Sequence, residues 1–190
     1  MRLNVLQKNK KMERIAVFCS SHDNLPEPFV QAAEQLGTWL GQNGKTLVYG
    51  GVKKGLMEVL AKAVRKNGGL VMGIIPDKMI QRGLESDEID IEYPMVDLSD
   101  RKATILREAD IFIALPGGFG TLDEIFSVVA SALVGEHQKT VLLYNVYGYW
   151  NPLIQLFEEF QKNGTLSSNS PEHLLLKIDT FQELINFISK

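Results

Sequence analysis

The chain has 190 residues, which is enough for one domain with a full hydrophobic core. Its net charge of −3 and its 23% of charged residues create no broad positive field, so we expect neither nucleic acid nor an anionic membrane as a partner. A single cysteine, Cys19, excludes an internal disulfide and is typical of a reducing compartment. The basic N-terminal segment has no apolar block of signal-peptide length, and no later run is long enough to span a membrane. We therefore expect a cytoplasmic protein.

Two kinds of segment alternate along the chain: short apolar runs, which predict buried strands, and runs with apolar residues at helical spacing, which predict helices. We expect strands at residues 14–19, 45–49, 70–75, 95–98, 111–115, 140–144 and 173–178. We expect helices at residues 26–43, 55–66, 99–108, 121–134 and 151–162, and a last one that begins with a capping box at Thr180. Residues 76–93 are expected to form a loop with at most a short helix, and Ser99 is the expected N-cap of the helix that follows.

The alternation predicts an α/β fold in one domain, with a doubly wound parallel sheet and helices on both of its faces. This domain is expected to span residues 14–190, behind a flexible N-terminal extension at residues 1–13. Ligands of such sheets bind at the carboxyl ends of the strands, near the point where the strand order reverses. Turns that leave the predicted sheet at this edge contain Ser20 and Ser21, Gly50 and Gly51, and Pro116–Thr121. Together they indicate a pocket, although the pair of glycines at 50 and 51 alone is more typical of a tight turn.

The sharpest motif is Pro116–Thr121, which reads PGGFGT and lies between a buried strand and the start of a helix. Gly117, Gly118 and Gly120 allow the backbone to approach a ligand closely. The free N–H groups and the positive dipole end of the following helix would stabilise an anion at the same place. The motif therefore predicts a phosphate site. It matches neither the dinucleotide-binding fingerprint nor the P-loop, so we expect no dinucleotide cofactor and no triphosphate hydrolysis.

Three charged residues near this motif, Glu124, Arg101 and Lys102, have alternative interpretations. Thr121 and Glu124 have the spacing of a capping box, in which Glu124 would only hold the N–H of Thr121, and the local pattern favours this reading. If a phosphate occupies the amides instead, the carboxylate of Glu124 lies beside a bound ester and can serve chemistry. Arg101 and Lys102 could be solvated charges, but the start of their helix can also lie beside the next strand's carboxyl end, where an arginine reaches a phosphate or a carboxylate.

The other candidate residues have mainly structural interpretations. Asp123 is expected to interact with the helix dipole from the first turn of its helix, and Cys19 ends a buried strand without a basic neighbour, which indicates a structural thiol. The three histidines, at positions 22, 137 and 173, show no metal-ligand spacing, so no metal is expected.

Residues Pro116–Glu124 match the PGGxGTxxE signature of the Lonely Guy family of cytokinin riboside 5′-monophosphate phosphoribohydrolases, also labelled "possible lysine decarboxylase". Further segments resemble the family in the same order: Phe18–Ser21, Tyr49–Gly51, Gly55–Met57, Arg101–Ala103, Asp110–Leu115, Gly135 with His137, and Asn145 with Gly148 and Tyr149. The resemblance covers residues 14–165. It implies a Rossmann-like fold, a homodimer, and hydrolysis of the N-glycosidic bond of a nucleoside 5′-monophosphate to free base and ribose 5-phosphate, without a cofactor or metal.

By the same resemblance, Arg101 and Glu124 form the catalytic pair. The phosphate and ribose would be held by Lys102, Gly117, Gly118, Gly120 and Thr121, with Ser20, Ser21, Gly50 and Gly51 as further pocket residues. This agrees with the chemistry, because breaking a glycosidic C–N bond builds oxocarbenium character on the sugar, which a nearby carboxylate can stabilise while it activates water.

Departures from the family pattern concentrate near the expected base pocket. Ser127, Ala130, Ser131 and Leu133 stand where family members often carry Glu, Thr, Trp and Gln. Prenylated adenine, adenine and other bases therefore all remain possible leaving groups. Two other functions also stay open: a non-catalytic carrier of a nucleotide or of the molybdenum cofactor, which would have no need for the Arg101–Glu124 pair, and a phosphate-binding regulatory module in which Glu124 only caps its helix.

Overall fold

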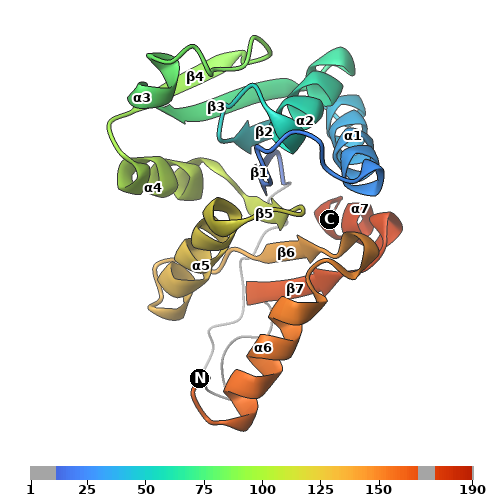
Figure 1. The fold of residues 1–190 in the computed structure, drawn as a ribbon, viewed down its shortest axis with the longest axis vertical. Helices are drawn as coiled ribbons and strands as arrows, with labels where there is room; N and C mark the ends of the chain where they lie inside the picture. The colour runs from blue at the N-terminus through green and yellow to red at the C-terminus, as the bar shows by residue number, and fades with distance from the viewer. Residues whose placement is uncertain (1–11, 167–173, 190) are drawn as a thin grey trace, which may run out of the picture.

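The structure is a computed structural model that describes residues 12–166 and 174–189. Within these ranges the strands are β1 (Arg14–Phe18), β2 (Thr46–Tyr49), β3 (Leu70–Pro76), β4 (Ile91–Met95), β5 (Ile111–Ala114), β6 (Val141–Tyr144) and β7 (Leu175–Ile178). The helices are α1 (Glu27–Gln42), α2 (Gly55–Lys66), α3 (Asp77–Ile80), α4 (Leu98–Glu108), α5 (Phe119–Leu133), α6 (Asn151–Lys162) and α7 (Phe181–Ile188), with a 3-10 turn at Val146–Gly148 (Figure 1).

All seven described strands form one parallel sheet in the order β4-β3-β2-β1-β5-β6-β7. The chain builds one half of the sheet outward from β1 to β4, crosses back, and builds the other half outward from β5 to β7. The strand order therefore reverses between β1 and β5, where Phe18 pairs with Ala114. This confirms the predicted doubly wound sheet, and it places the favoured ligand position at the carboxyl ends of these two central strands.

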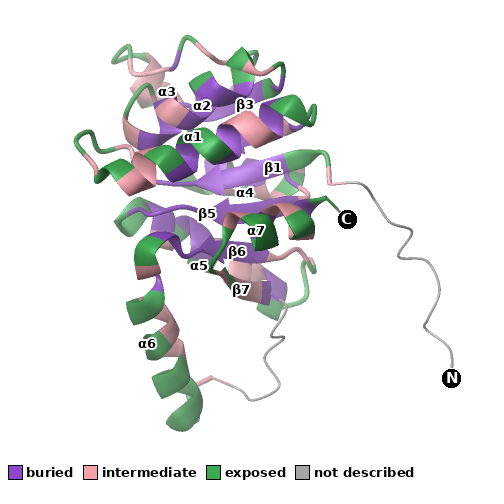
Figure 2. Cartoon of the chain, turned by 90° about the vertical axis from the view of Figure 1, so that its right-hand side faces the viewer, coloured by how far each residue is buried: buried purple, intermediate pink, exposed green. Residues whose placement is uncertain are grey.

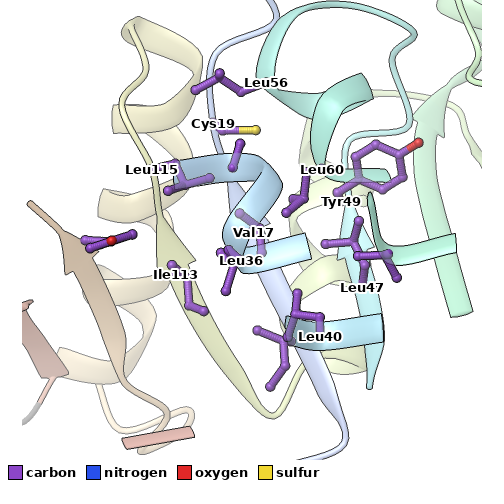
Figure 3. Packing of buried hydrophobic residues seen from close by; sticks show 14 of the residues in the cluster. Val17, Cys19, Leu36, Leu40, Leu47, Tyr49, Leu56, Leu60, Ile113 and Leu115 are labelled. Atoms are coloured by element: carbon purple, nitrogen blue, oxygen red, sulfur yellow. The ribbon is translucent and has the colours of Figure 1, made fainter. Parts of the chain in front are cut away.

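Helices cover both faces of the sheet. On one face, residues of α1, α2 and α7 pack against alternate residues of the strands, and Figure 3 shows part of this cluster around Val17, Leu36 and Leu60. On the other face, residues of α4, α5 and α6 pack around Phe18 and Phe112. After the exposed Arg14, neighbouring residues of β1 point to opposite faces and Ile15–Phe18 all lie buried, which explains the continuous apolar sequence of these four residues. Each fully buried large aliphatic or aromatic side chain stabilises the fold by about 1.5–3 kcal/mol.

The sequence prediction was wrong at the fourth strand. It is formed by Ile91–Met95, not by residues 95–98, because β4 is an edge strand with one buried residue and so lacks an apolar run. The N-cap of α4 is Asp97 rather than Ser99: one Asp97 carboxylate oxygen accepts hydrogen bonds from the N–H groups of Ser99, at 2.8 Å, and Asp100, at 2.9 Å. The short helix α3 agrees with the expectation of a loop with at most a short helix at residues 76–93, although β4 takes the end of that segment.

The structure describes the C-terminal helix of the predicted domain but only part of its two flanking segments. The capping box at Thr180 is present at the start of α7 and confirms the prediction there. Residues 1–11, most of the expected extension, and residue 173, the expected start of the last strand, lie outside the described residues.

Helix α6 differs from the other long helices because none of its residues is buried. Figure 2 shows it projecting from the body of the fold with exposed residues along its length. It nevertheless carries apolar side chains, including Leu156 and Phe160, which are 45% and 39% exposed. Across residues 12–166 and 174–189, no helix combines the length and the apolar character needed to cross a membrane.

Candidate active site

The predicted phosphate motif, Pro116–Thr121, forms the turn after β5 and the start of α5; it is named the phosphate turn for this prediction. Helix α5 begins at Phe119, and its N-cap, Gly118, has no side chain that could satisfy the first amides. Gly118, Phe119 and Gly120 are all exposed. Because the first N–H groups of a helix have no partner within it, these amides and the helix dipole offer an open site for an anion.

Gly117 has a close-packing role in this turn. A Cβ atom at this position would lie 2.1 Å from the Thr121 hydroxyl oxygen and 3.1 Å from the Ser20 nitrogen, so only glycine fits. The N–H of Ser20 donates a hydrogen bond to the carbonyl of Pro116 at 3.1 Å. The turns after β1 and β5 are thus bound to each other at the point where the strand order reverses.

Arg101 and Glu124 form a buried ion pair beside this turn. Arg101 Nη2 lies 2.7 Å from Glu124 Oε1, and the two side chains are 11% and 6% exposed. Arg101 Nε also donates to the carbonyl of Ile74 at 2.9 Å, which anchors the guanidinium at the carboxyl end of β3. Gly50 leaves room for it, since a Cβ there would lie 2.5 Å from Arg101 Nη2. The structure therefore brings together three of the residues that the sequence singled out, from three different segments.

Burial governs the electrostatics of the pair. Loss of water raises the pKa of the Glu124 carboxyl above its ordinary value, and the neighbouring Arg101 charge lowers it only in part. Burial also raises the pKa of the Cys19 thiol strongly, with a smaller contribution from the Glu124 charge, so Cys19 is an unreactive thiol. A buried ion pair is weak evidence for stability, and a carboxyl with a raised pKa beside an anion site is typical of functional sites.

The capping-box interpretation of Glu124 was wrong. The helix begins two residues before Thr121, and the Glu124 carboxylate binds Arg101 rather than the N–H of Thr121. Asp123 is likewise not in the first turn: its two carboxylate oxygens lie 2.8 and 2.9 Å from Lys102 Nζ. The two ion pairs join α4 to α5 side by side.

Two other predicted residues lie at the margin of this arrangement. Gly51 has a φ of +76°, which favours glycine, and a Cβ there would lie 3.0 Å from Ile75. Ser21 is partly exposed, and its backbone carbon would lie 2.7 Å from a Cβ at Gly55. Both residues therefore pack against neighbouring turns and strands, and neither of these contacts involves the ion pair. Within the described ranges, no three His, Cys, Asp or Glu side chains form a group that could hold a metal ion.

Sequence reasoning gave no role to the aromatic residues after β6, which hold the phosphate turn from the other side. The Tyr149 hydroxyl donates to the Gly117 carbonyl at 2.8 Å, and Trp150 Nε1 donates to the Ala114 carbonyl at 3.2 Å. Asn145 organises this segment, because its side-chain oxygen accepts from the Trp150 N–H at 2.8 Å. Tyr149 had been noted only as a matching position of the family, and no local pattern indicates a bond across 32 residues.

The fold and the site together define an α/β protein with a glycine-rich turn at the reversal of the strand order and a buried Arg–Glu pair beside it. The family model described as "Possible lysine decarboxylase" matches residues 57–188. The chain therefore belongs to this family, which confirms the resemblance found in its motifs.

Relatives support this assignment, and solved structures share the fold. The chain is 36% identical over 182 residues to cytokinin riboside 5′-monophosphate phosphoribohydrolase LOG4 of Arabidopsis thaliana, covering 96% of this chain and 84% of that protein. It is 37% identical over 175 residues to the probable cytokinin riboside 5′-monophosphate phosphoribohydrolase LOGL2 of Oryza sativa subsp. japonica, covering 92% of this chain and 71% of that protein. The fold is similar to the Moco carrier protein of Chlamydomonas reinhardtii, with a TM-score of 0.69, 20% identity and coverage of 93% and 95%. The fold is also similar to the molybdenum cofactor binding protein of Rippkaea orientalis, with a TM-score of 0.67 and 23% identity. This match covers 94% of this chain and 96% of that chain.

Proposed function

We propose that the protein hydrolyses the N-glycosidic bond of a nucleoside 5′-monophosphate and releases free base and ribose 5-phosphate. The observation that carries this proposal is the buried pair of Arg101 and Glu124, 2.7 Å apart, one helical turn beyond the open amides of α5. Relatives that are 36–37% identical over most of the chain bear the name of this activity, which supports it. A carrier protein needs the anion site but has no use for a buried catalytic carboxylate.

In the proposed mechanism, the substrate phosphate lies on the amides at Gly118–Thr121, and this binding energy positions the ribose against Glu124. As the bond from C1′ to the base nitrogen breaks, positive charge grows on the sugar, and the Glu124 carboxylate stabilises it. A water molecule adds its oxygen to C1′ and passes a proton to Glu124, while the departing nitrogen gains a proton from solvent. Arg101 fixes Glu124 and the substrate oxygens, and Lys102 supplies positive charge at the same end of the site.

A panel of nucleoside 5′-monophosphates tests the proposal. Each is incubated with the protein and with Glu124→Gln, and free base is measured by chromatography, with free lysine as a substrate control for decarboxylation. We expect release from at least one nucleotide and a fall of about 10²–10⁴-fold in Glu124→Gln. Glu34→Gln, a carboxylate on the exposed side of α1, is the matched control. Binding without release across the panel would support the carrier function instead.

We also propose that the protein works as a homodimer in the cytoplasm. Apolar side chains are exposed on α5, the turn after it and α6, including Phe126 at 40%, Leu133 at 48% and Val134 at 77%. A second copy of the chain would remove this surface from water. A single buried cysteine in the sequence supports a reducing compartment.

A further inference from the structure

The turn after β7 lies beside the turn after β6 at the carboxyl edge of the sheet. Tyr144 pairs with Ile178 at the ends of the two strands, and the N–H of Asn145 donates to the Ile178 carbonyl at 2.8 Å. Asp179 is the next residue and directly precedes the N-cap of α7. Its carboxylate oxygen Oδ1 accepts a hydrogen bond from the Asn145 side-chain nitrogen at 2.7 Å. Through this bond the C-terminal part of the sheet contacts the segment that holds the phosphate turn.

The side-chain amide of Asn145 is buried, and all of its hydrogen-bonding groups have partners. Asn145 is 5% exposed. Its nitrogen donates to the side-chain oxygen of Asn151 at 2.9 Å and to Asp179 at 2.7 Å, and its oxygen accepts from the Trp150 N–H at 2.8 Å. An amide nitrogen has two hydrogens, so both donors are used. Because a buried donor without a partner costs free energy, removal of Asp179 disturbs the amide rather than freeing it.

Asp179 also determines which way the Asn145 amide is oriented. Hydrogen bonds from Asn145 and Lys177 hold the pKa of the Asp179 carboxyl below its ordinary value, so it is ionised at neutral pH and can only accept. The Trp150 N–H can only donate. A rotated amide would therefore place oxygen against carboxylate and N–H against N–H. Asn151 cannot fix the orientation alone, since its own amide can rotate with that of Asn145.

The Trp150 backbone carries this orientation to the phosphate turn. The Trp150 ring is 3% exposed and donates to the Ala114 carbonyl at 3.2 Å, while its neighbour Tyr149 donates to the Gly117 carbonyl at 2.8 Å. The two rings pack edge to face with centroids 4.9 Å apart, so they move together. Tyr147 in the same segment has a φ of +52°, a strained conformation that persists only where surrounding contacts hold it.

We propose that Asp179 is a positioning residue for phosphate binding: it fixes the Asn145 amide and thereby the two aromatic side chains that hold the phosphate turn. Asp179 acts through these residues and does not itself touch the turn. The inference rests on the proposed function, because it takes the phosphate turn as the place where the substrate phosphate binds.

Two substitutions of similar size separate the acceptor from the volume of the side chain. Asp179→Asn keeps an oxygen that can accept from Asn145, and Asp179→Leu does not. The Kd for ribose 5-phosphate, a product of the proposed reaction, is measured by calorimetry. We expect Asp179→Leu to weaken binding about two- to tenfold, as for loss of one hydrogen bond, and Asp179→Asn to remain close to the parent. KM for the nucleotide should rise in the same proportion in Asp179→Leu, with a smaller change in kcat.

Two control variants disturb the neighbours of Asp179 without removing its acceptor. Lys177→Met deletes the ion pair in which Lys177 Nζ lies 2.9 Å from Asp179 Oδ2. Thr180→Ala deletes the bond between the Thr180 hydroxyl and the Glu183 N–H, and so weakens the start of α7. Both should bind ribose 5-phosphate like the parent, although urea denaturation should show lower stability for Thr180→Ala. The inference fails if Asp179→Leu binds like the parent, if Asp179→Asn is equally impaired, or if Thr180→Ala loses as much affinity.

The indole N–H of Trp150 gives a spectroscopic readout. The chain contains two tryptophans, so Trp39→Phe leaves Trp150 as the source of a single indole N–H resonance. In this background Asp179→Leu should shift that resonance and speed its hydrogen exchange, whereas Asp179→Asn should not. An unchanged resonance in Asp179→Leu would overturn the inference. A parent that binds ribose 5-phosphate but releases no base from any nucleotide would overturn only the proposed function, and a parent that does not bind ribose 5-phosphate would overturn both.

Discussion

At the scale of single residues, the site depends on one carboxyl group that the fold keeps away from water. Glu124 is 5% exposed, and its partner Arg101 is held by the Ile74 carbonyl as well as by the ion pair. Desolvation of two charges normally exceeds their mutual attraction unless further hydrogen bonds contribute. The ion pair therefore adds little to the stability of the fold. In the proposed mechanism it holds the Glu124 carboxylate in place for the positive charge that grows on the sugar.

The pH dependence of activity follows from the raised pKa of Glu124. Because the mechanism uses the ionised carboxylate, kcat/KM should fall as pH decreases through a pKa above the ordinary 4.5. The raised pKa has the opposite effect on folding: its stabilising contribution is complete below pH 4.5 and is lost as pH rises through the folded-state pKa. Activity should thus fall on the acid side without any loss of stability that stems from Glu124 itself. We would measure kcat/KM and circular dichroism over the same pH range, and full activity at pH 4.5 would contradict the assignment.

Two neighbouring glycines in the phosphate turn should respond differently to a methyl group. Gly117→Ala places its Cβ 2.1 Å from the Thr121 hydroxyl oxygen, so we expect a loss of about 1–3 kcal/mol in the free energy of unfolding. Gly118→Ala is the matched control, because a Cβ there meets no atom of the described chain within 4 Å. Urea denaturation measures both, and equal stability of the two variants would show that the close packing at Gly117 is not required.

At the scale of elements, three segments after three central strands make the site. The turns after β1 and β5 bond through Ser20 and Pro116, and the segment after β6 bonds to the β5 end through Tyr149 and Trp150. The first turn of α4 brings Arg101 across from the other half of the sheet. Each element is thus held at the carboxyl edge by hydrogen bonds to backbone carbonyls, and the Arg101–Glu124 pair comes from the first turn of α4 and the second turn of α5.

Tyr149→Phe tests whether the segment after β6 positions the phosphate turn. The variant loses only the hydroxyl that donates to the Gly117 carbonyl, so the turn gains freedom and phosphate binding weakens. We expect KM for the nucleotide to rise about two- to tenfold with a smaller change in kcat. Tyr147→Phe, at a residue that is 85% exposed, provides the control. A fall in kcat at constant KM would argue against a positioning role.

The elements show what a sequence can predict and what it cannot. Strands buried on both faces, such as β1 and β5, have continuous apolar runs, and their bounds were predicted closely. The edge strand β4 has no such run and was misplaced. Local patterns also misjudged Glu124, since its spacing from Thr121 fits a capping box equally well. Its pairing with Arg101 depends on how α4 and α5 lie side by side, and the bond from Tyr149 to Gly117 depends on tertiary structure in the same way.

At the scale of the whole molecule, the described fold leaves apolar side chains exposed on α5, on the turn after it and on α6. The body packs helices on both faces of the sheet, but α6 projects from it without a buried residue (Figure 2). Val134, which follows α5, is 77% exposed. Exposed patches of this kind usually mark an interaction surface.

Oligomeric state is therefore a direct prediction. Sedimentation equilibrium should give a dimer for the parent, and Val134→Asp should shift it toward monomer, because a charge in an apolar interface loses its hydration. Leu70→Asp, at an exposed apolar residue at the start of β3, should leave the dimer intact. A monomeric parent, or a dimer that Val134→Asp does not affect, would show that this surface is not the interface.

A crystal structure of Glu124→Gln with AMP gives the most direct test of the central claim, because this variant should bind the nucleotide without cleaving it. The phosphoryl group should lie on the amides of Gly118–Thr121, with C1′ in contact with the side chain at position 124. A phosphoryl group bound elsewhere, with those amides open to water, would contradict the account.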